Sequence, residues 1–233
     1  MCADRAYRRS EAFFGRRKIK ALYKRQEGLF STLLPKLVID VTEPNLDPVN
    51  RLFPNKSAYV SLEIGFGAGE HLLHQSVTYP DRGFIGVEPF VNSMAKALSE
   101  VERKEIDNIR LYNEDAVELL DWLQPDCLDR IDILYPDPWP KKRHWKRRFI
   151  NQPNLHRFAK VLKPGGYVNF ACDITSYVNW TLQHFHKHAA FCWTAQTPMD
   201  WQNPFENWVQ TRYESKAIRE GRKSAYLSFQ KIG

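Results

Sequence analysis

The chain has 233 residues, 43% of them hydrophobic and 13% aromatic, and a formal net charge of +7. This length can bury one sizeable core, which favours a single α/β domain with a tail or small additions, and the positive charge favours an acidic partner. Four scattered cysteines without a Cys-x-x-Cys pair indicate neither a disulfide framework nor a zinc site. Because the N-terminus is too charged for a signal peptide and no apolar run is long enough to span a membrane, we expect a cytoplasmic protein.

The first 25 residues contain nine Lys or Arg against two acidic residues, Asp4 and Glu11. We expect a basic N-terminal arm over residues 1–33, and two interpretations stay open: a solvated, disordered charge run, or an arm that becomes ordered on a nucleic acid. The main domain is expected over residues 34–233. Its apolar start is expected to dock the arm, and residues 43–56, rich in Pro, Asn and Asp, predict a loop.

A glycine-rich turn follows the first predicted strand, residues 59–64, and precedes a helical pattern over residues 70–77. Glycines at such a turn let the backbone approach a ligand at the N-terminus of the next helix. A dinucleotide fingerprint requires Gly or Ala where Glu70 stands, so Gly65 and Gly67, with Glu63 just before them, fit a methyl-donor loop better. An ordinary strand-to-helix turn is the alternative.

The next two predicted strands also end in polar residues. Residues 83–88 end in Glu88, where a carboxylate can accept two hydrogen bonds from ribose hydroxyls. A helix over residues 91–105 and a strand over residues 109–112 then lead to Asp115 and Ala116. Asp115 fits the N-cap of a helix over residues 116–123, and its place on the same edge also favours contact with an adenine.

The run that ends in Asp137 organises the rest of the chain. Three prolines, Pro136, Pro138 and Pro140, forbid a central strand from continuing, so Asp137 is expected just past the carboxyl end of the fourth strand. Cations interleaved with Trp139, His144 and Trp145 follow directly: Lys141, Lys142, Arg143, Lys146, Arg147 and Arg148. A cationic and aromatic surface beside a lone carboxylate suits a polyanion that offers flat bases.

The second half of the chain continues the alternation of strands and helices. A helix over residues 152–162 stops at Lys163-Pro-Gly-Gly166, and a strand over residues 167–172 leads to Asp173. A helix over residues 177–188 follows, and strands over residues 191–197 and 225–231 bracket a polar insertion. The pattern predicts an α/β fold with a mostly parallel, doubly wound sheet, whose crevice lies outside the carboxyl ends of its strands. The acidic residues expected there are Glu63, Glu88, Asp115, Asp137 and Asp173.

Two further patterns have an ordinary structural explanation. Thr211 and Glu214 form a capping box that opens a helix over residues 212–220, although the basic surroundings also allow them to face a substrate. Histidines 71 and 74, and 184, 186 and 188, have spacings that suit a metal, but no Cys or carboxylate of suitable spacing completes either set, so we expect no metal site.

Several motifs together resemble the bacterial tRNA (guanine-N7)-methyltransferases, over about residues 34–231. They are Leu62-Glu-Ile-Gly-Phe-Gly-Ala-Gly69, Gly86-Val-Glu88, Pro136-Asp-Pro-Trp139 with Lys141 and Arg147-Arg148, Lys163-Pro-Gly-Gly166, and Thr211-Arg-Tyr-Glu214 with Arg219-Glu-Gly221. The resemblance implies a Rossmann-like, seven-stranded S-adenosylmethionine-dependent methyltransferase fold and methylation of the variable-loop guanine of tRNA. One departure is Cys172, where relatives often carry Thr.

The resemblance also implies roles for individual residues. It places Glu63, Glu88, Asp115 and Asp137 on the S-adenosylmethionine side. It places Lys141, Asp173, Thr211, Arg212, Tyr213 and Glu214 on the tRNA side. No membrane or metal is implied, and we expect a monomer or a homodimer.

The chemistry points to Asp137 as the catalytic residue. Guanine N7 has a lone pair and no proton, so methylation needs in-line positioning and fixed negative charge rather than a general base. Two other functions remain open. The loop Asp137-Pro-Trp139 also resembles the Asp-Pro-Pro-aromatic loop of exocyclic-amine nucleic-acid methyltransferases, and the chain could be a non-catalytic RNA-binding module that keeps a methyltransferase shell.

Overall fold

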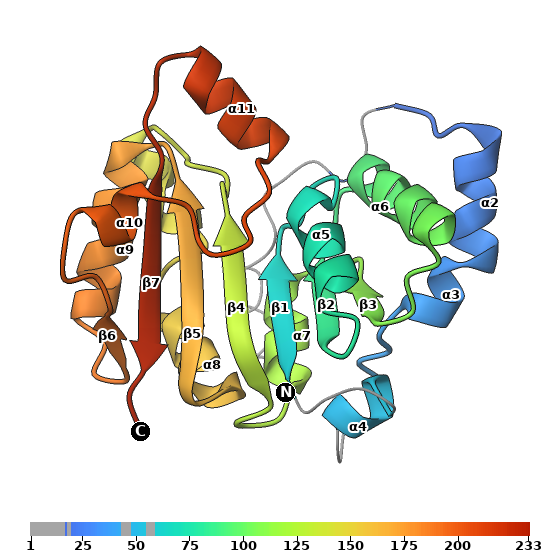
Figure 1. Cartoon of the computed structure of the whole chain (residues 1–233), viewed down its shortest axis with the longest axis horizontal. Coiled ribbons are helices and arrows are strands. Elements are labelled where there is room, and N and C mark those ends of the chain that lie inside the picture. Colours follow the sequence, from blue (N-terminus) through green and yellow to red (C-terminus); the bar gives the residue numbers. More distant parts are fainter. Residues whose placement is uncertain (1–16, 18–19, 43–47, 55–58) are drawn as a thin grey trace.

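The computed structural model describes residues 17, 20–42, 48–54 and 59–233, and seven of its strands form one sheet in the order β3-β2-β1-β4-β5-β7-β6 (Figure 1). The strands are β1 (Val60–Ile64), β2 (Gly83–Val87), β3 (Ile109–Tyr112), β4 (Leu128–Leu134), β5 (Leu162–Cys172), β6 (Phe191–Trp193) and β7 (Ala225–Lys231). Neighbouring strands from β3 to β5 are parallel, and β7 is antiparallel to both β5 and β6. The predicted fold, a mostly parallel and doubly wound sheet, is confirmed.

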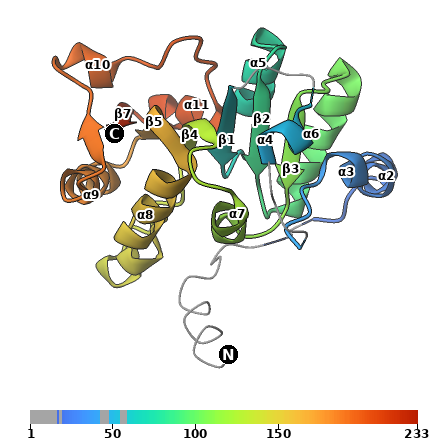
Figure 2. The ribbon, with the colours of Figure 1, turned by 90° about the horizontal axis from the view of Figure 1, so that it is seen from below.

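Helices cover both faces of this sheet, and all five residues of β1 and of β2 are buried. One face packs on α7 (Ala116–Trp122), α8 (Gln152–Val161) and α9 (Thr175–His186), which Figure 2 shows together on one side. The other face of β1 to β3 packs on α5 (Glu70–Thr78) and α6 (Val91–Lys104). The carboxyl ends of the parallel strands therefore meet at one edge.

The face of the sheet opposite α9 carries a row of polar side chains in register. Glu63 pairs with Asp132, Asp132 with Asn169, and Asn169 with Ser228, across four neighbouring strands. The Asn169 amide donates to Asp132 (3.1 Å), and the Ser228 hydroxyl donates to the Asn169 side-chain oxygen (2.9 Å). Asp132 also accepts a hydrogen bond from Arg130 (2.9 Å), so these buried groups satisfy one another.

The folded domain begins earlier than residue 34. Residues 24–32, which we assigned to the basic arm, form α2 (Lys24–Thr32), and Leu29 of this helix is buried in the same core as α6. Arg25 also forms an ion pair with Glu102 of α6 (2.7 Å). The helix α3 (Leu34–Leu37) follows, and Ile39 donates its N–H to Leu111 of β3 (2.9 Å). The assignment of residues 24–33 to the arm is therefore wrong, and most of the remaining arm lies outside the described residues.

Three other predicted boundaries differ from the structure. The predicted loop over residues 43–56 contains α4 (Pro48–Leu52), and Phe53 after it is buried. The strand predicted to start at residue 167 starts at Leu162, because the chain rejoins β4 through an irregular stretch in which Gly165 has a φ of 79°. The strand predicted over residues 191–197 ends at Trp193.

Three short elements lie between or beyond the main strands: the 3-10 helix η1 (Lys142–Arg147), α10 (Met199–Gln202) and α11 (Arg212–Arg219). In Figure 1, α11 stands above the carboxyl ends of the strands. Among the described residues there is neither a helix of the length and apolarity needed to span a bilayer nor a cluster of three potential metal ligands.

Candidate active site

The glycine loop is held against the end of β2 by its own backbone. The N–H of Gly65 donates to the carbonyl of Val87 (2.8 Å), and the N–H of Gly67 donates to the carboxylate of Glu88 (2.8 Å). Gly65 and Gly67 have φ values of 75° and 59°, a left-handed conformation that favours glycine. A Cβ at Gly65 would meet no atom within 4 Å, so the loop leaves open space beside its backbone.

Glu63 lies at the end of β1 and is engaged inside the protein. It is 4% exposed, and its carboxylate contacts Nδ1 of His71 on α5 at 2.9 Å. Burial alone would lower the pKa of His71, but the adjacent Glu63 carboxylate outweighs burial and raises this pKa above its usual value. Trp208 covers the pair, with its ring centroid 5.3 Å from that of His71. His71 is therefore a partner of Glu63 that the sequence analysis missed.

Glu88 is a buried carboxylate at this edge, and its pKa is raised. Its two oxygens accept hydrogen bonds from the backbone N–H groups of Gly67 (2.8 Å) and Phe90 (2.9 Å), which fix its orientation. Burial nevertheless raises the pKa of Glu88 to about 7, and the nearby charge of Asp137 adds to this rise. A ligand that donates hydrogen bonds to the ionised form of this carboxylate stabilises that form and lowers its pKa.

Asp115 has the predicted place just past β3. Its carboxylate accepts the N–H of Val117 (3.0 Å), so it is the N-cap of α7, and Ala116 beside it is buried. Arg17, from the predicted arm, reaches the same edge: it forms an ion pair with Glu114 (2.5 Å) and accepts the N–H of Val91 at its carbonyl (2.8 Å).

The loop that carries Asp137 is strained on both sides of this residue. Tyr135 and Trp139 have φ values of 50° and 42°, which cost about 1–3 kcal/mol each for non-glycine residues and persist only where surrounding contacts fix them. The Tyr135 hydroxyl contacts that of Ser224 at 2.8 Å and fixes one side of the loop. Solvent reaches Asp137, but the walls of the site partly desolvate its carboxylate and raise its pKa.

Arg148 fixes the other side of the loop, and its expected place on the phosphate-binding surface is wrong. The residue is 1% exposed, and its guanidinium donates to the carbonyl of Pro138 (3.0 Å) and to the carbonyl and hydroxyl of Ser176 (2.8 and 3.0 Å). Aromatic rings surround the cation at 4.4, 4.7 and 5.5 Å from their centroids: Trp145, Tyr177 and Trp180. A charge held in this way cannot reach a phosphate.

The rest of the basic segment does face solvent. Lys141, Lys142, Arg143 and Lys146 are exposed, and none of these four forms an ion pair with a residue that the structure describes. Arg147 lies over the ring of Trp139 at 4.9 Å. Four cations without acidic partners, next to the Asp137 loop, form a local positive surface suited to a polyanion.

Asp173 follows β5 at the same edge and already has a cationic partner. Its carboxylate accepts a hydrogen bond from Nε of Arg222 at 2.5 Å, and Arg222 also pairs with Glu220. Asp173 therefore links the end of β5 to the segment between α11 and β7.

The four residues from Thr211 to Glu214 separate into two pairs. Thr211 accepts the N–H of Glu214 (3.2 Å), but the buried Glu214 carboxylate accepts hydrogen bonds from Trp208 (2.7 Å) and Tyr226 instead of closing the capping box. Only half of the predicted capping box forms. Arg212 and Tyr213 are exposed and lie next to the glycine loop, since a Cβ on Gly67 would stand 3.5 and 3.7 Å from their side chains.

This edge gathers carboxylates beside the glycine loop. Glu88 and Asp115 hold oriented carboxylates just past β2 and β3, and Gly65 leaves open space beside its backbone. Doubly wound sheets bind their ligands at this edge, outside the carboxyl ends of the strands.

The comparisons with known proteins give the family. A family model described as "Putative methyltransferase" matches residues 57–227. The chain belongs to the tRNA (guanine-N(7)-)-methyltransferase family, since it is 57% identical over 231 residues to the protein of that name from Rhizobium meliloti (strain 1021), which covers 99% of this chain and 100% of the relative. A relative of the same name from Agrobacterium fabrum is 57% identical over 229 residues, covering 98% and 99% of the two chains.

Solved structures agree on the fold. The 16S rRNA methyltransferase KamB matches with a TM-score of 0.60 and 16% identity, over 82% of this chain and 95% of its own. The antibiotic-resistance methyltransferase Kmr matches with a TM-score of 0.55 and 16% identity, over 78% and 90% of the two chains. The Rossmann-like methyltransferase fold implied by the motifs is thereby confirmed.

Proposed function

We propose that this chain transfers a methyl group from S-adenosylmethionine to N7 of a guanine in the variable loop of tRNA, in the cytosol. The observation that supports this most is the lone, partly desolvated carboxylate of Asp137 on a strained loop, near Glu88 and beside a positive surface. The names of the full-length relatives support the same reaction.

The cofactor side is built from the glycine loop and the carboxylates that follow β1 to β3. In this proposal Glu88 binds the ribose hydroxyls, Asp115 and Ala116 border the adenine, and Gly65 and Gly67 let the backbone come close. Glu63 fixes the floor of the site through its contact with His71. When bound, S-adenosylmethionine supplies an electrophilic methyl group on a sulfonium.

Asp137 stabilises the charge that develops on the substrate. The N7 lone pair of guanine carries no proton, so this chain needs no base to remove one; it needs a fixed negative charge where the purine becomes cationic. The Asp137 carboxylate accepts hydrogen bonds from the N–H groups at the edge of the guanine. These bonds hold the ring in line with the methyl donor. Its partial desolvation strengthens both effects, because electrostatic interactions are less screened there.

The substrate side combines the exposed cations with residues just after β5 and at the N-terminus of α11. Lys141 and its neighbours bind phosphates of the tRNA, while Arg212 and Tyr213 lie next to Gly67 and border both ligands. Asp173, Thr211 and Glu214 act mainly by fixing these segments, through Arg222, Trp208 and Tyr226.

The test is transfer of labelled methyl from S-adenosylmethionine to unmodified tRNA, followed by nucleoside analysis. A 7-methylguanosine product is expected. N6-methyladenosine would establish the exocyclic-amine reaction instead, which the Asp-Pro-Trp loop also allows. Tight binding of tRNA without affinity for the methyl donor would establish the non-catalytic RNA-binding module.

We expect the affinity for S-adenosylmethionine to fall about tenfold between pH 8 and pH 6. The pKa of Glu88 is about 7 in the free protein, and ribose hydroxyls favour its ionised form, so binding below pH 7 must first remove a proton. Calorimetric titration at several pH values measures this. Glu88→Gln is the control: it should bind more weakly and lose this part of the pH dependence, while any titration of the ligand itself is common to both proteins. An equal pH dependence in the two proteins would contradict the role of Glu88.

Lys141→Ala should weaken tRNA binding several-fold at low salt and reduce the slope of log K against log salt by about one. The reason is that Lys141 is exposed, without an acidic partner among the described residues, and neutralises one phosphate. Filter binding at four salt concentrations measures the slope. Lys187→Ala removes an exposed cation at the far end of α9 and should leave the slope unchanged; equal slopes for both variants would exclude a phosphate contact at Lys141.

A further inference from the structure

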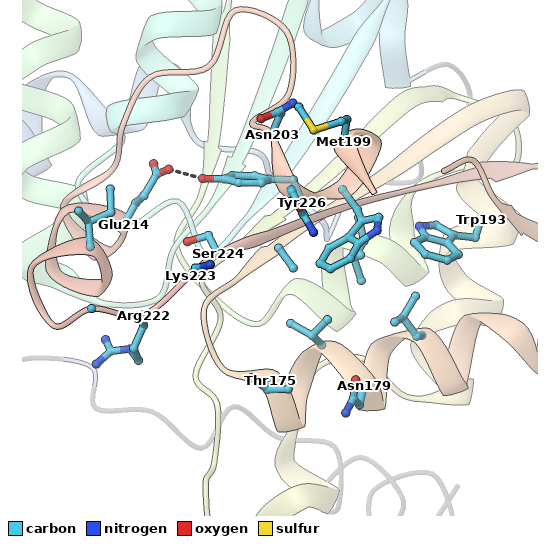
Figure 3. A pocket seen from close by; sticks show the side chains of 18 residues that line it. Thr175, Asn179, Trp193, Met199, Asn203, Glu214, Arg222, Lys223, Ser224 and Tyr226 are labelled. Carbon is cyan, nitrogen blue, oxygen red and sulfur yellow. Dashed lines mark hydrogen bonds between the residues drawn. The ribbon is translucent and has the colours of Figure 1, made fainter. Parts of the chain in front are cut away.

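A pocket of about 920 Å³ lies next to the candidate active site, between α9, α10, α11 and β7 (Figure 3). In Figure 3, Thr175 and Asn179 stand on one side of it and Met199 and Asn203 on the other. Trp193 closes one end, and Arg222 lies at the opposite end. The volume is at the upper end of the roughly 300–1,000 Å³ that is usual for small-ligand sites.

Two residues that line the pocket also contact residues of the candidate active site. Ser224, which lines it, contacts the hydroxyl of Tyr135 in the loop that carries Asp137 (2.8 Å). Arg222, which also lines it, donates to Asp173 at the end of β5. The pocket therefore adjoins both the loop that carries Asp137 and the end of β5.

The lining combines exposed apolar faces with side-chain amides. Trp193, Met199 and Ile218 border the pocket and are 44%, 60% and 58% exposed, so they present apolar surface to a ligand. Three amides of the lining make no side-chain hydrogen bond within the described part of the chain: Asn179, Gln202 and Asn203. A flat aromatic wall with free amide donors and acceptors is the chemistry that binds an unstacked nucleobase by its face and by its edge.

The free charge of the pocket is positive. Glu214 is buried and accepts a hydrogen bond from Tyr226, as Figure 3 shows, and Arg222 is neutralised by Asp173. Lys223 is exposed and pairs with no acidic group in the described residues. Lys223 can therefore bind a phosphate group, and it lies next to Ser224, which contacts the loop that carries Asp137.

From these features we infer that the pocket between α9, α10, α11 and β7 binds a second, unpaired nucleotide of the tRNA, distinct from the guanine that is methylated. Trp193 stacks on its base and the free amides contact the base edge, while Lys223, toward the other end of the pocket, holds the phosphate of a neighbouring nucleotide. The inference rests on the proposed function in that tRNA is the substrate. It adds a binding subsite by which the protein recognises nucleotides around its target.

The test measures tRNA affinity, at one fixed salt concentration, for the full-length chain and its variants. Trp193→Ala should raise the Kd for tRNA about tenfold, as expected for the loss of one base–aromatic stack, whereas Trp193→Phe should stay within threefold of the wild type. Asn179→Ala, on an exposed helix face, should raise the Kd about threefold. Tyr167→Ala removes another exposed aromatic ring, on β5 away from the pocket, and is the matched control.

The affinity for S-adenosylmethionine, measured on the same proteins, shows that the variants are folded and should not change. A rise in Kd of fivefold or more in Trp193→Ala, with the control unchanged, supports the subsite. A smaller rise overturns it, as does an equal loss in Tyr167→Ala. Because binding is measured apart from methyl transfer, a wild type that binds tRNA without methylating it would count against the proposed reaction alone.

Discussion

Asp137→Ala is expected to lower kcat for methyl transfer about a hundredfold to a thousandfold, with the fold intact. The variant removes the fixed negative charge that the purine cation requires, and interactions of this kind are worth about 3–4 kcal/mol or more in a partly desolvated site. It should not unfold the protein, because the Asp137 side chain is exposed and the loop is held by its neighbours. Single-turnover transfer to tRNA measures the loss.

The controls for Asp137 separate charge from structure. Asp137→Asn keeps the size of the side chain and one acceptor oxygen but removes its charge, so it should lose most of the rate. Asp81→Ala removes an exposed carboxylate just before β2, at the opposite edge of the sheet, and should keep wild-type activity. If Asp137→Ala keeps activity within tenfold of the wild type, Asp137 is not the catalytic residue.

Arg148→Lys is expected to lower both the stability and kcat. Lysine cannot donate to Pro138 and to both groups of Ser176 at once, so buried acceptors lose partners and the free energy of unfolding should fall by about 2–4 kcal/mol. The freed loop moves Asp137, and a displacement of about 1 Å costs roughly a hundredfold in rate. Urea unfolding and single-turnover kinetics measure the two effects.

The affinity for S-adenosylmethionine distinguishes a positioning role of Arg148 from general damage. The hydrogen bonds of Arg148 within the described part of the chain go to the Asp137 loop and α9 rather than to the glycine loop, so cofactor affinity should stay within threefold while kcat falls. Arg143→Lys, an exposed arginine of the same basic segment, should change neither stability nor kcat. A proportional loss of cofactor affinity and kcat in Arg148→Lys would indicate a purely structural role.

The burial of Arg148 could not be predicted from the sequence. In a run of six cations nothing local distinguishes the one that is buried, because the rings of Tyr177 and Trp180 that surround it come from α9, about thirty residues later. The same holds for Glu214: the sequence predicts a capping box, but Tyr226 and Trp208 compete for its carboxylate. Tertiary contacts override local preferences at both residues.

Elements defined by local pattern are predicted well. The bounds of β3 and β7 agree with the structure because their runs of apolar residues end at polar residues or turns on both sides. The start of β5 was missed because Pro164 and Gly165 indicate a break, whereas the chain pairs again with β4 after a shift of register. Glu88, Asp115 and Asp137 all follow the strands expected, since the carboxyl ends of parallel strands meet at one edge.

The polar row from Glu63 to Ser228 has a consequence for how the sheet assembles. β7 is the last strand of the chain, yet it must insert between β5 and β6, and strand pairing over such long separations is prone to slip by one residue. A slip would turn Ser228 toward the apolar side where Phe229 stacks on Phe185, and would bring Phe229 onto Asn169. Both changes would bury polar groups without hydrogen-bond partners, which costs free energy. The polar row therefore restricts β7 to a single register and disfavours misfolded pairings of the sheet.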